Sequence, residues 1–201
     1  GNRPADVIAE FSKTGLANFV AFSDVDMGAP HTLKTLKAFP SVPRFQNAEK
    51  MFDKFGSQID AVIVGTPDLL HFPTVMMALM QGKHVYVEKP MAHTFREIEL
   101  MMAAEKKSGL ACQMGNQGHS EANYFQFKAW TEAGIIKNVT RITAFMNNSR
   151  RWHGLKVAGY LPEQPIPASL DWDCWLATAQ YHQYNQGYVN GDWRSWFEFG
   201  D

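Results

Sequence analysis

Residues 59–90, IDAVIVGTPDLLHFPTVMMALMQGKHVYVEKP, contain two short apolar runs on either side of a helical stretch. The runs at 59–65 and 84–87 are continuously apolar and rich in β-branched residues, which is typical of strands buried on both faces. Between them, residues 72–81 have the length and composition of a helix that stops at Gly82. A strand, a helix and a second strand in this order predict a right-handed βαβ unit with parallel strands.

The same alternation continues in both directions from this unit. Residues 17–23 and 110–114 are further apolar runs, and residues 5–14, 29–38 and 47–55 carry apolar side chains at helical spacing. A further helix is expected over 94–108, because Thr94 and Glu97 form a capping-box pattern and Gly109 ends it. The pattern predicts an α/β fold with a Rossmann-like, doubly wound parallel sheet.

After about residue 120 the pattern changes. A helix is expected over 120–133, an alternating strand over 139–147 and a short helix over 170–177. Five of the six tryptophans follow residue 150: Trp152, Trp172, Trp175, Trp193 and Trp196. These features predict one domain over 1–119 and the start of a second over 120–201.

The overall composition excludes several classes of partner. The 19 basic and 20 acidic residues nearly cancel and form no run, so neither nucleic acid nor an acidic membrane is an expected partner. No apolar stretch approaches the roughly 18 residues of a membrane span. Two cysteines make no disulfide framework, and the histidines share no ligand spacing, so no metal site is predicted.

Ligands of doubly wound folds bind beyond the carboxyl ends of the strands. Asp24 ends the second predicted strand, 23 residues after Gly1, where an acidic residue would bind the ribose of NAD. Gly1 and Pro4 would belong to the preceding dinucleotide-binding turn. An acidic residue would repel the extra phosphate of NADP, although Arg44 or Lys50 would weaken this preference for NAD. A solvated turn residue is the alternative for Asp24.

The sequence Glu88-Lys89-Pro90 follows the run at 84–87 and would face the same crevice. A lysine in that position can bind a substrate hydroxyl group and lower its pKa, or transfer the proton itself. The alternative is a salt bridge within the loop.

Residues 60–102 resemble the Gfo/Idh/MocA family, the glucose–fructose oxidoreductase and inositol dehydrogenase group. The resemblance rests on the TP…H element at 66–71 followed by EKP at 88–90, and extends to SLDWDCWLATA at 169–179 and DWRSWFEFGD at 192–201. It is greatest to a bacterial sugar-handling branch close to the NAD-dependent glycosidases. The resemblance implies a Rossmann-like NAD(P)-binding domain followed by an α+β substrate and oligomerisation domain with an open sheet.

The resemblance also implies roles for individual residues. Expected around the cofactor are Asp24 at the adenosine ribose; Thr66, Pro67 and His71 after the fourth strand; Glu88, Lys89 and Pro90 near the nicotinamide; Asn116 and Gln117 near its ribose; and Trp193 and Arg194 folding back over it. The residues expected to face a sugar are Arg150, Trp152 and His153, with His153 as a general base or as a structural residue.

The implied function is an NAD(P)-dependent oxidoreductase that moves a hydride between nicotinamide and a sugar or cyclic polyol, with Lys89 as catalytic residue. One alternative is a glycosidase that uses NAD for transient oxidation and elimination. Another is a non-catalytic nucleotide- or sugar-binding fragment. The expected partners are a small-molecule substrate and further copies of the chain in a homo-oligomer.

Compared with the family pattern, the chain is expected to be truncated at both ends. The first strand of a sheet ordered 3-2-1-4-5-6 would precede Gly1, and that strand lies between the second and the fourth. Its loss would leave unpaired backbone groups on both neighbours. At the other end, Gly200-Asp201 resembles the start of a GD-x-x-x-H element whose histidine serves in acid–base chemistry.

Overall fold

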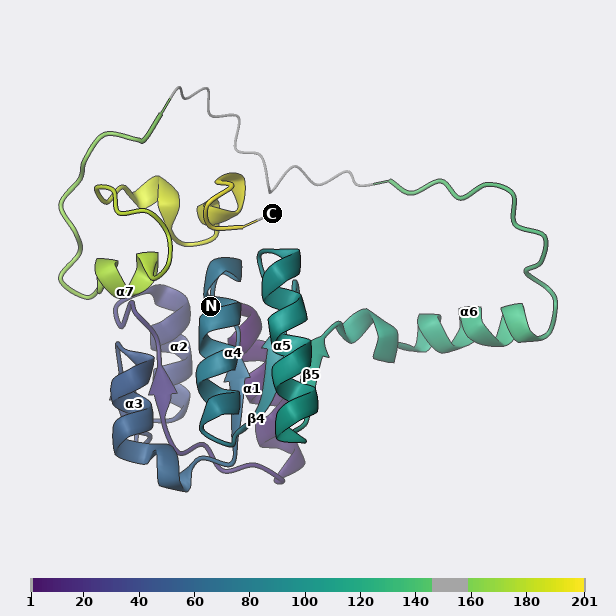
Figure 1. Ribbon diagram of the computed structural model, residues 1–201, viewed down its shortest axis with the longest axis horizontal. Helices are drawn as coiled ribbons and strands as arrows, with labels where there is room; N and C mark the ends of the chain where they lie inside the picture. Colours follow the sequence, from purple (N-terminus) through teal and green to yellow (C-terminus); the bar gives the residue numbers. More distant parts are fainter. Residues whose placement is uncertain (1, 146–158, 201) are drawn as a thin grey trace.

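Two parallel β-sheets and their covering helices form the first 120 residues of the computed structural model, which describes residues 2–145 and 159–200 (Figure 1). In one sheet, β1 (Phe22–Ser23) pairs with β2 (Arg44–Phe45). The other has the order β3-β4-β5, with β3 at Ala61–Val64, β4 at His84–Glu88 and β5 at Cys112–Gly115. Both pairings in this second sheet are parallel, which confirms the predicted α/β class.

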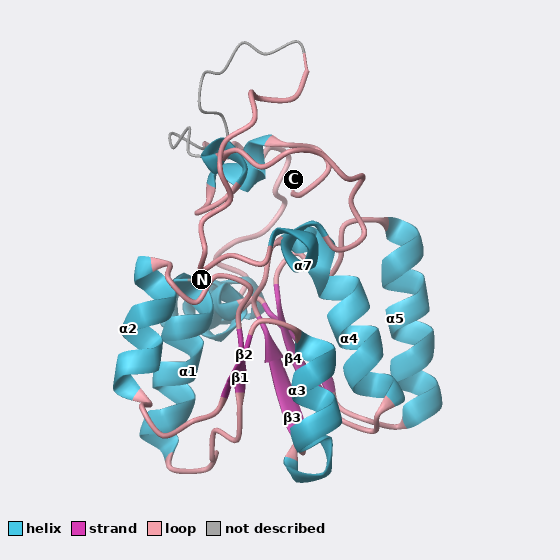
Figure 2. Ribbon diagram, turned by 90° about the vertical axis from the view of Figure 1, so that its left-hand side faces the viewer, coloured by secondary structure: helices cyan, strands magenta, loops and turns pink. Residues whose placement is uncertain are grey.

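Five helices accompany the strands at the predicted positions. They are α1 (Asn2–Thr14), α2 (Pro30–Ala38), α3 (Ala48–Phe55), α4 (His71–Met80) and α5 (Phe95–Ser108). Figure 2 shows α1 and α2 on one side of the strands and α4 and α5 on the other. Thr94 and Glu97 form the expected capping box at the start of α5. Gly109 then takes a left-handed φ of 68°, which ends the helix without the strain a side chain would add.

The first sheet differs in detail from the prediction. The strand expected over 17–23 is reduced to the two residues of β1, and β2 was not predicted at all. A two-residue strand is too short to show an alternating or continuously apolar pattern, so sequence periodicity gives no signal for it.

The two sheets are not joined to each other. No pairing connects β1 with β3 among the described residues, and residues of both strands line one cavity. This is the position of the central strand in the expected order 3-2-1-4-5-6. Helix α1 connects the two sides: it packs on α2, Phe11 meets Tyr86 of β4 edge to face, and Pro4 lies against Gly65.

The core of this region is aliphatic. Val64, Val85 and Val87 of the second sheet pack with Val75 of α4 and Met101 of α5, all of them at most 4% exposed. Alternate residues of a strand point to opposite faces, so Val85 and Val87 face α4 and α5 while Tyr86 and Glu88 face α1. The apolar runs therefore fill the space between sheet and helices.

Beyond β5 the chain leaves the sheets. Helix α6 (Ala122–Glu132) points away from the rest of the molecule and has no buried residue (Figure 1). The strand expected over 139–147 is wrong where it is described, because no strand is assigned to 139–145; residues 146 and 147 lie outside the described residues. An alternating segment becomes a strand only with a partner to pair with, and no described strand lies alongside it.

Residues 159–200 form a compact segment, here called the aromatic lobe, on top of the α/β region. It contains α7 (Trp172–Leu176) and the 3₁₀ helices Gln186–Tyr188 and Asp192–Ser195. The other 3₁₀ helices of the described chain are Gly56–Gln58, Asp68–Leu70 and Gln117–Ser120. The lobe docks through backbone hydrogen bonds, including Asp171 N to Val25 O at 2.9 Å and Leu69 N to Phe199 O at 3.3 Å.

Among residues 2–145 and 159–200, no helix combines the length and the apolar character that crossing a bilayer requires.

Candidate functional site

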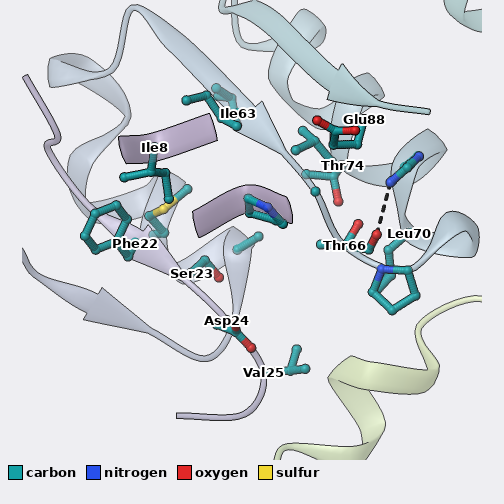
Figure 3. A pocket seen from close by; sticks show the side chains of 18 of the residues that line it. Ile8, Phe22, Ser23, Asp24, Val25, Ile63, Thr66, Leu70, Thr74 and Glu88 are labelled. Atoms are coloured by element: carbon teal, nitrogen blue, oxygen red, sulfur yellow. Dashed lines mark hydrogen bonds between the residues drawn. The ribbon is translucent and has the colours of Figure 1, made fainter. Parts of the chain in front are cut away.

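A cavity of about 1600 Å³ runs between the two sheets, from the amino ends of the strands to the carboxyl ends of β1, β3 and β4 below the aromatic lobe. The structure brings eight of the predicted site residues to its wall. Those from the α/β region are Asp24, Thr66, Pro67, His71, Glu88 and Lys89. Those from the aromatic lobe are Trp193 and Arg194. Figure 3 shows Asp24 at one side of this cavity and Thr66 and Glu88 at the other.

Asp24 follows β1, and its carboxylate is held by its own loop and by α2. Oδ2 accepts a hydrogen bond of 2.8 Å from the Thr32 hydroxyl, and Oδ1 accepts one of 3.0 Å from the backbone N–H of Asp26. These contacts fix a half-buried negative charge at the wall of the cavity. Such a carboxylate can accept hydrogen bonds from vicinal hydroxyl groups.

The loop after β3 leads directly into α4, whose first residue is His71. The His71 side chain is 1% exposed. Its Nδ1 lies 2.6 Å from the Pro90 carbonyl oxygen and its Nε2 lies 3.1 Å from the Thr66 carbonyl oxygen. Burial lowers the pKa of His71, while the two carbonyl groups and the carboxylate of Glu88 act in the opposite direction. The ring thus contacts the loops after both β3 and β4.

Glu88 ends β4 and is 4% exposed. Its Oε1 accepts a hydrogen bond of 2.6 Å from Gln117 Nε2, which also donates to the Tyr86 hydroxyl at 3.1 Å. A Cβ at Gly115 would lie 2.9 Å from both Glu88 Oε1 and the Tyr86 hydroxyl, so a glycine is needed beside them. The second oxygen, Oε2, is buried and has no hydrogen-bond partner among the described residues.

Lys89 is exposed, in contrast to its neighbour Glu88, and lines the cavity. An ammonium group there is an adaptable point charge with three donor hydrogens. No ion pair with a loop carboxylate is found for Lys89 in the described part of the chain, where the close pairs are Lys13–Glu10, Arg96–Glu99 and Lys128–Glu132. The side chain can therefore present a proton donor to a hydroxyl group in the cavity.

Trp193 and Arg194 reach the cavity from the aromatic lobe. The Arg194 guanidinium carbon lies 4.1 Å from the centre of the Trp193 ring, a cation–π distance. Trp193 itself is 8% exposed and packs so closely on Gly200 that an added Cβ would lie 2.6 Å from the ring. The lobe therefore closes one end of the cavity with a fixed aromatic surface.

Three predicted residues do not line the cavity. Pro90 and Gln117 contact it indirectly, through His71 and Glu88 respectively. Asn116 turns toward His119, with Nδ2 2.5 Å from the Nδ1 of the histidine ring. Four further residues lie outside the described part of the chain: Gly1, Arg150, Trp152 and His153.

Tyr86 was missed in the sequence reasoning, although a signal for it exists. It precedes Glu88 by two positions on a strand, and residues with that spacing share a face of the sheet.

No cluster of three or more His, Cys, Asp or Glu side chains suited to a metal ion occurs within residues 2–145 and 159–200.

Comparison with known proteins matches two family models to the chain. An oxidoreductase family with an NAD-binding Rossmann fold matches residues 6–116. The C-terminal α/β domain of an oxidoreductase family matches residues 129–201. The first match alone covers more than half of the chain.

Two curated relatives come from Bacillus subtilis. The NAD(+)-dependent scyllo-inositol 2-dehydrogenase is 33% identical over 78 residues, 39% of this chain and 23% of the relative. The NADP(+)-dependent scyllo-inositol 2-dehydrogenase IolW is 28% identical over 92 residues, 46% of this chain and 26% of the relative. The chain thus matches about a quarter of the length of each. Neither name supports the predicted placement near the glycosidases.

A solved structure supports the fold. The WlbA dehydrogenase from Bordetella pertussis, in complex with NADH and UDP-GlcNAcA, superposes with a TM-score of 0.57 at 24% identity. The superposition covers 67% of this chain and 40% of that protein.

Proposed function

The chain belongs to the Gfo/Idh/MocA oxidoreductase family with its NAD-binding Rossmann fold, and on this premise we propose that it is an NAD-dependent dehydrogenase of a sugar or cyclic polyol. The observation that carries the proposal is the cavity between the two sheets, whose wall at the carboxyl ends of the parallel strands contains Asp24, Glu88 and Lys89. The named activity of the two scyllo-inositol dehydrogenases supports a polyhydroxylated ring as substrate.

The residues of the cavity fit the two ends of a dinucleotide. The fixed Asp24 carboxylate suits the hydroxyl groups of the adenosine ribose. At the other end, Glu88 Oε2 is a buried oxygen without a hydrogen-bond partner among the described residues, and an N–H or O–H group of the nicotinamide half would satisfy it. Thr66 and Pro67 would lie between these ends, while Trp193 and Arg194 would cover them.

We propose NAD rather than NADP as the cofactor. If Asp24 binds the adenosine ribose, its negative charge would lie beside the additional phosphate of NADP. The nearby cation Arg44 donates from Nη2 to the Leu36 carbonyl oxygen at 3.1 Å, and neither Arg44 nor Lys50 lines the cavity. Binding of NADP would therefore have to overcome the repulsion between its phosphate and Asp24. It would also require Arg44 to turn away from the Leu36 carbonyl oxygen.

When bound, NAD would supply the hydride-accepting or hydride-donating chemistry. On oxidation the neutral amine of Lys89 would accept the proton of the reacting hydroxyl group, and on reduction the ammonium form would return it. Glu88 and Gln117 hold the end of β4, and the aromatic lobe excludes water from that end of the cavity. The protein therefore orients the reactants and manages the proton.

The proposal is tested with purified protein, NAD and NADP, and scyllo-inositol together with a panel of hexoses. NAD at 100 times its Kd should stabilise the protein by about 2.7 kcal/mol in a thermal shift, and NADP should bind more weakly. Lys89→Ala should lower the rate of NADH formation by about 100-fold or more, as expected for loss of an acid–base group, with the Kd of NAD close to that of the wild type.

Lys83→Ala is the matched control, because Lys83 lies just before β4, at the opposite end of the strand from Lys89. It should leave both binding and turnover unchanged. Failure of the wild-type protein to bind either nucleotide would overturn the proposed function and favour a non-catalytic role. Unchanged turnover in Lys89→Ala would instead remove only the role given to Lys89.

A further inference from the structure

His71 joins two loops that the sequence separates by about twenty residues. Thr66 follows β3 and Pro90 follows β4, and these strands are parallel neighbours, so both loops begin at the same edge of the sheet. The buried imidazole of His71 lies between the two carbonyl groups, 2.6 Å from Pro90 O and 3.1 Å from Thr66 O. Its ring nitrogens are therefore directed at backbone oxygens of the two loops.

The ring of His71 cannot donate a hydrogen bond to both carbonyl oxygens while it is neutral. Both are acceptors, and a neutral imidazole has one N–H to donate. The shorter contact, from Nδ1 to Pro90 O, is the one that requires the hydrogen. Burial lowers the pKa of His71 and so favours the neutral ring, even though Glu88 and the two carbonyl groups oppose this shift and Lys89 adds to it. The neutral ring thus holds the loop of Pro90 by a direct hydrogen bond.

Lys89 is bracketed by two such contacts. On its N-terminal side, the backbone of Glu88 is paired with Gly115 of β5, and its carboxylate is held by Gln117 at 2.6 Å. On its C-terminal side, the Pro90 carbonyl oxygen is held by His71 at the same distance. The lysine side chain is exposed and long, so the direction in which it starts is set by a backbone fixed at both neighbouring residues.

We propose that His71 is a positioning residue, whose hydrogen bond to the Pro90 carbonyl oxygen orients the backbone of Lys89 and thereby aims its ammonium group into the cavity. The inference rests on the function proposed for Lys89 and changes the role expected for His71 from the sequence. His71 acts through the loop, rather than by touching the cofactor.

Three substitutions separate this role from mere filling of space. His71→Asn retains an N–H donor at the position of Nδ1, two bonds from Cβ, and should still reach Pro90. His71→Gln places its amide near the position of Nε2 instead and should reach Thr66. His71→Phe retains a ring and removes both ring nitrogens. The proposal predicts that the asparagine variant behaves as the wild type and that the other two variants do not.

The first measurement is the ¹³C-methyl NMR signal of reductively methylated Lys89, identified by its loss in Lys89→Arg. We expect a signal displaced from the shift of a free lysine in the wild type and in His71→Asn, and a signal at the shift of a free lysine in His71→Gln and His71→Phe. The second measurement is turnover. Misplacement of a catalytic group by about 1 Å costs on the order of 100-fold, so kcat should fall by about this factor in the last two variants while the Kd of NAD stays constant.

The outcomes distinguish the inference from the function on which it rests. The NMR signal needs neither cofactor nor turnover, so it reports on the loop even when the wild type fails to bind NAD. An unchanged Lys89 signal in folded His71→Phe would overturn the inference, as would a loss in His71→Asn equal to that in His71→Gln. Circular dichroism confirms that each variant is folded, and the asparagine and glutamine variants provide the comparison should His71→Phe not fold.

Discussion

The α/β region and the aromatic lobe are stabilised by two different kinds of core. In the α/β region, Val64, Val87 and Met101 pack between a parallel sheet and long helices. In the aromatic lobe, Trp172 stacks on Trp175 with ring centres 4.9 Å apart, and Tyr188 lies fully buried beside Phe199. The lobe has one five-residue helix and short 3₁₀ helices, and its described residues contribute no strand.

The difference shows how a segment with little regular structure can still have a core. Large rings bury much area for each residue, so few of them are needed to exclude water from a small lobe. Their polar atoms then need partners: the Trp172 indole N–H donates to His182 O at 2.9 Å, and the Trp196 indole N–H donates to Gly187 O at 3.0 Å. These bonds give hydrogen-bond partners to backbone carbonyl oxygens in a lobe where helices are short.

The largest loss of stability is expected from a substitution in the aromatic core, and it tests whether the two cores unfold separately. Trp172→Ala removes a ring that is 3% exposed and should cost about 3–5 kcal/mol of the free energy of unfolding. Because the remaining tryptophans lie mainly in the lobe and most helical residues in the α/β region, urea unfolding is followed by both Trp fluorescence and circular dichroism. We expect the fluorescence transition to shift to lower urea and the circular dichroism transition to move little.

Two controls accompany this variant. Met101→Ala, in the aliphatic core, should shift the circular dichroism transition to lower urea and move the fluorescence transition little. Its free energy of unfolding should fall by about 2–5 kcal/mol. Phe197→Ala alters a ring that is 90% exposed and should change neither transition. Equal shifts of both signals in Trp172→Ala would mean that the two cores unfold as one unit.

A smaller effect is expected where α1 meets the second sheet. An added Cβ at Gly65 would lie 2.3 Å from Cγ of Pro4, so Gly65→Ala forces α1 away from the end of β3. Such overpacking costs about 1–3 kcal/mol. The circular dichroism transition in urea measures it, and Gly118→Ala serves as the control because nothing lies within 4 Å of its added Cβ. Equal midpoints for the two variants would show that α1 is free to move.

The sequence predicted the α/β region better than the lobe, for a physical reason. Apolar periodicity and caps are local signals, and they located α5 and its capping box to within one residue. The pairing of β1 with β2 and the loss of the strand expected over 139–147 depend on whether a partner strand is present, which no local pattern records. In the aromatic lobe, tryptophan content predicted a change of architecture but not its packing.

The candidate site was predictable wherever strand ends determine position. Asp24, Thr66 and Lys89 follow parallel strands and Glu88 ends one, and all four line one cavity. The ring contacts of His71 and the link between Gln117 and Glu88 were not predictable, because they depend on side-chain directions across neighbouring loops. Contacts of this kind require the fold before they can be assigned.

The smallest expected effect concerns the contact that connects the two regions. The Ser169 hydroxyl group, in the lobe, donates a hydrogen bond of 2.8 Å to Asp26 Oδ1, in the loop after β1. Ser169→Ala should cost about 0.5–1.5 kcal/mol of the free energy of unfolding, the usual net value of one such bond. Because the bond lies between the regions, its loss should move the fluorescence transition further from the circular dichroism transition.

A double-mutant cycle with Asp26→Ala isolates this coupling from the other contacts of each residue. Asp26 Oδ1 also accepts from the backbone N–H of Gly28 at 3.0 Å, so Asp26→Ala alone should cost more than Ser169→Ala. Ser41→Ala, at an exposed position of the α/β region, should move neither transition. A coupling energy near zero would mean that the aromatic lobe is held by its other contacts, among them the backbone bonds of Val25 and Leu69 and the bond from Gln46 Nε2 to Ser169 O, independently of its side-chain contact with Asp26.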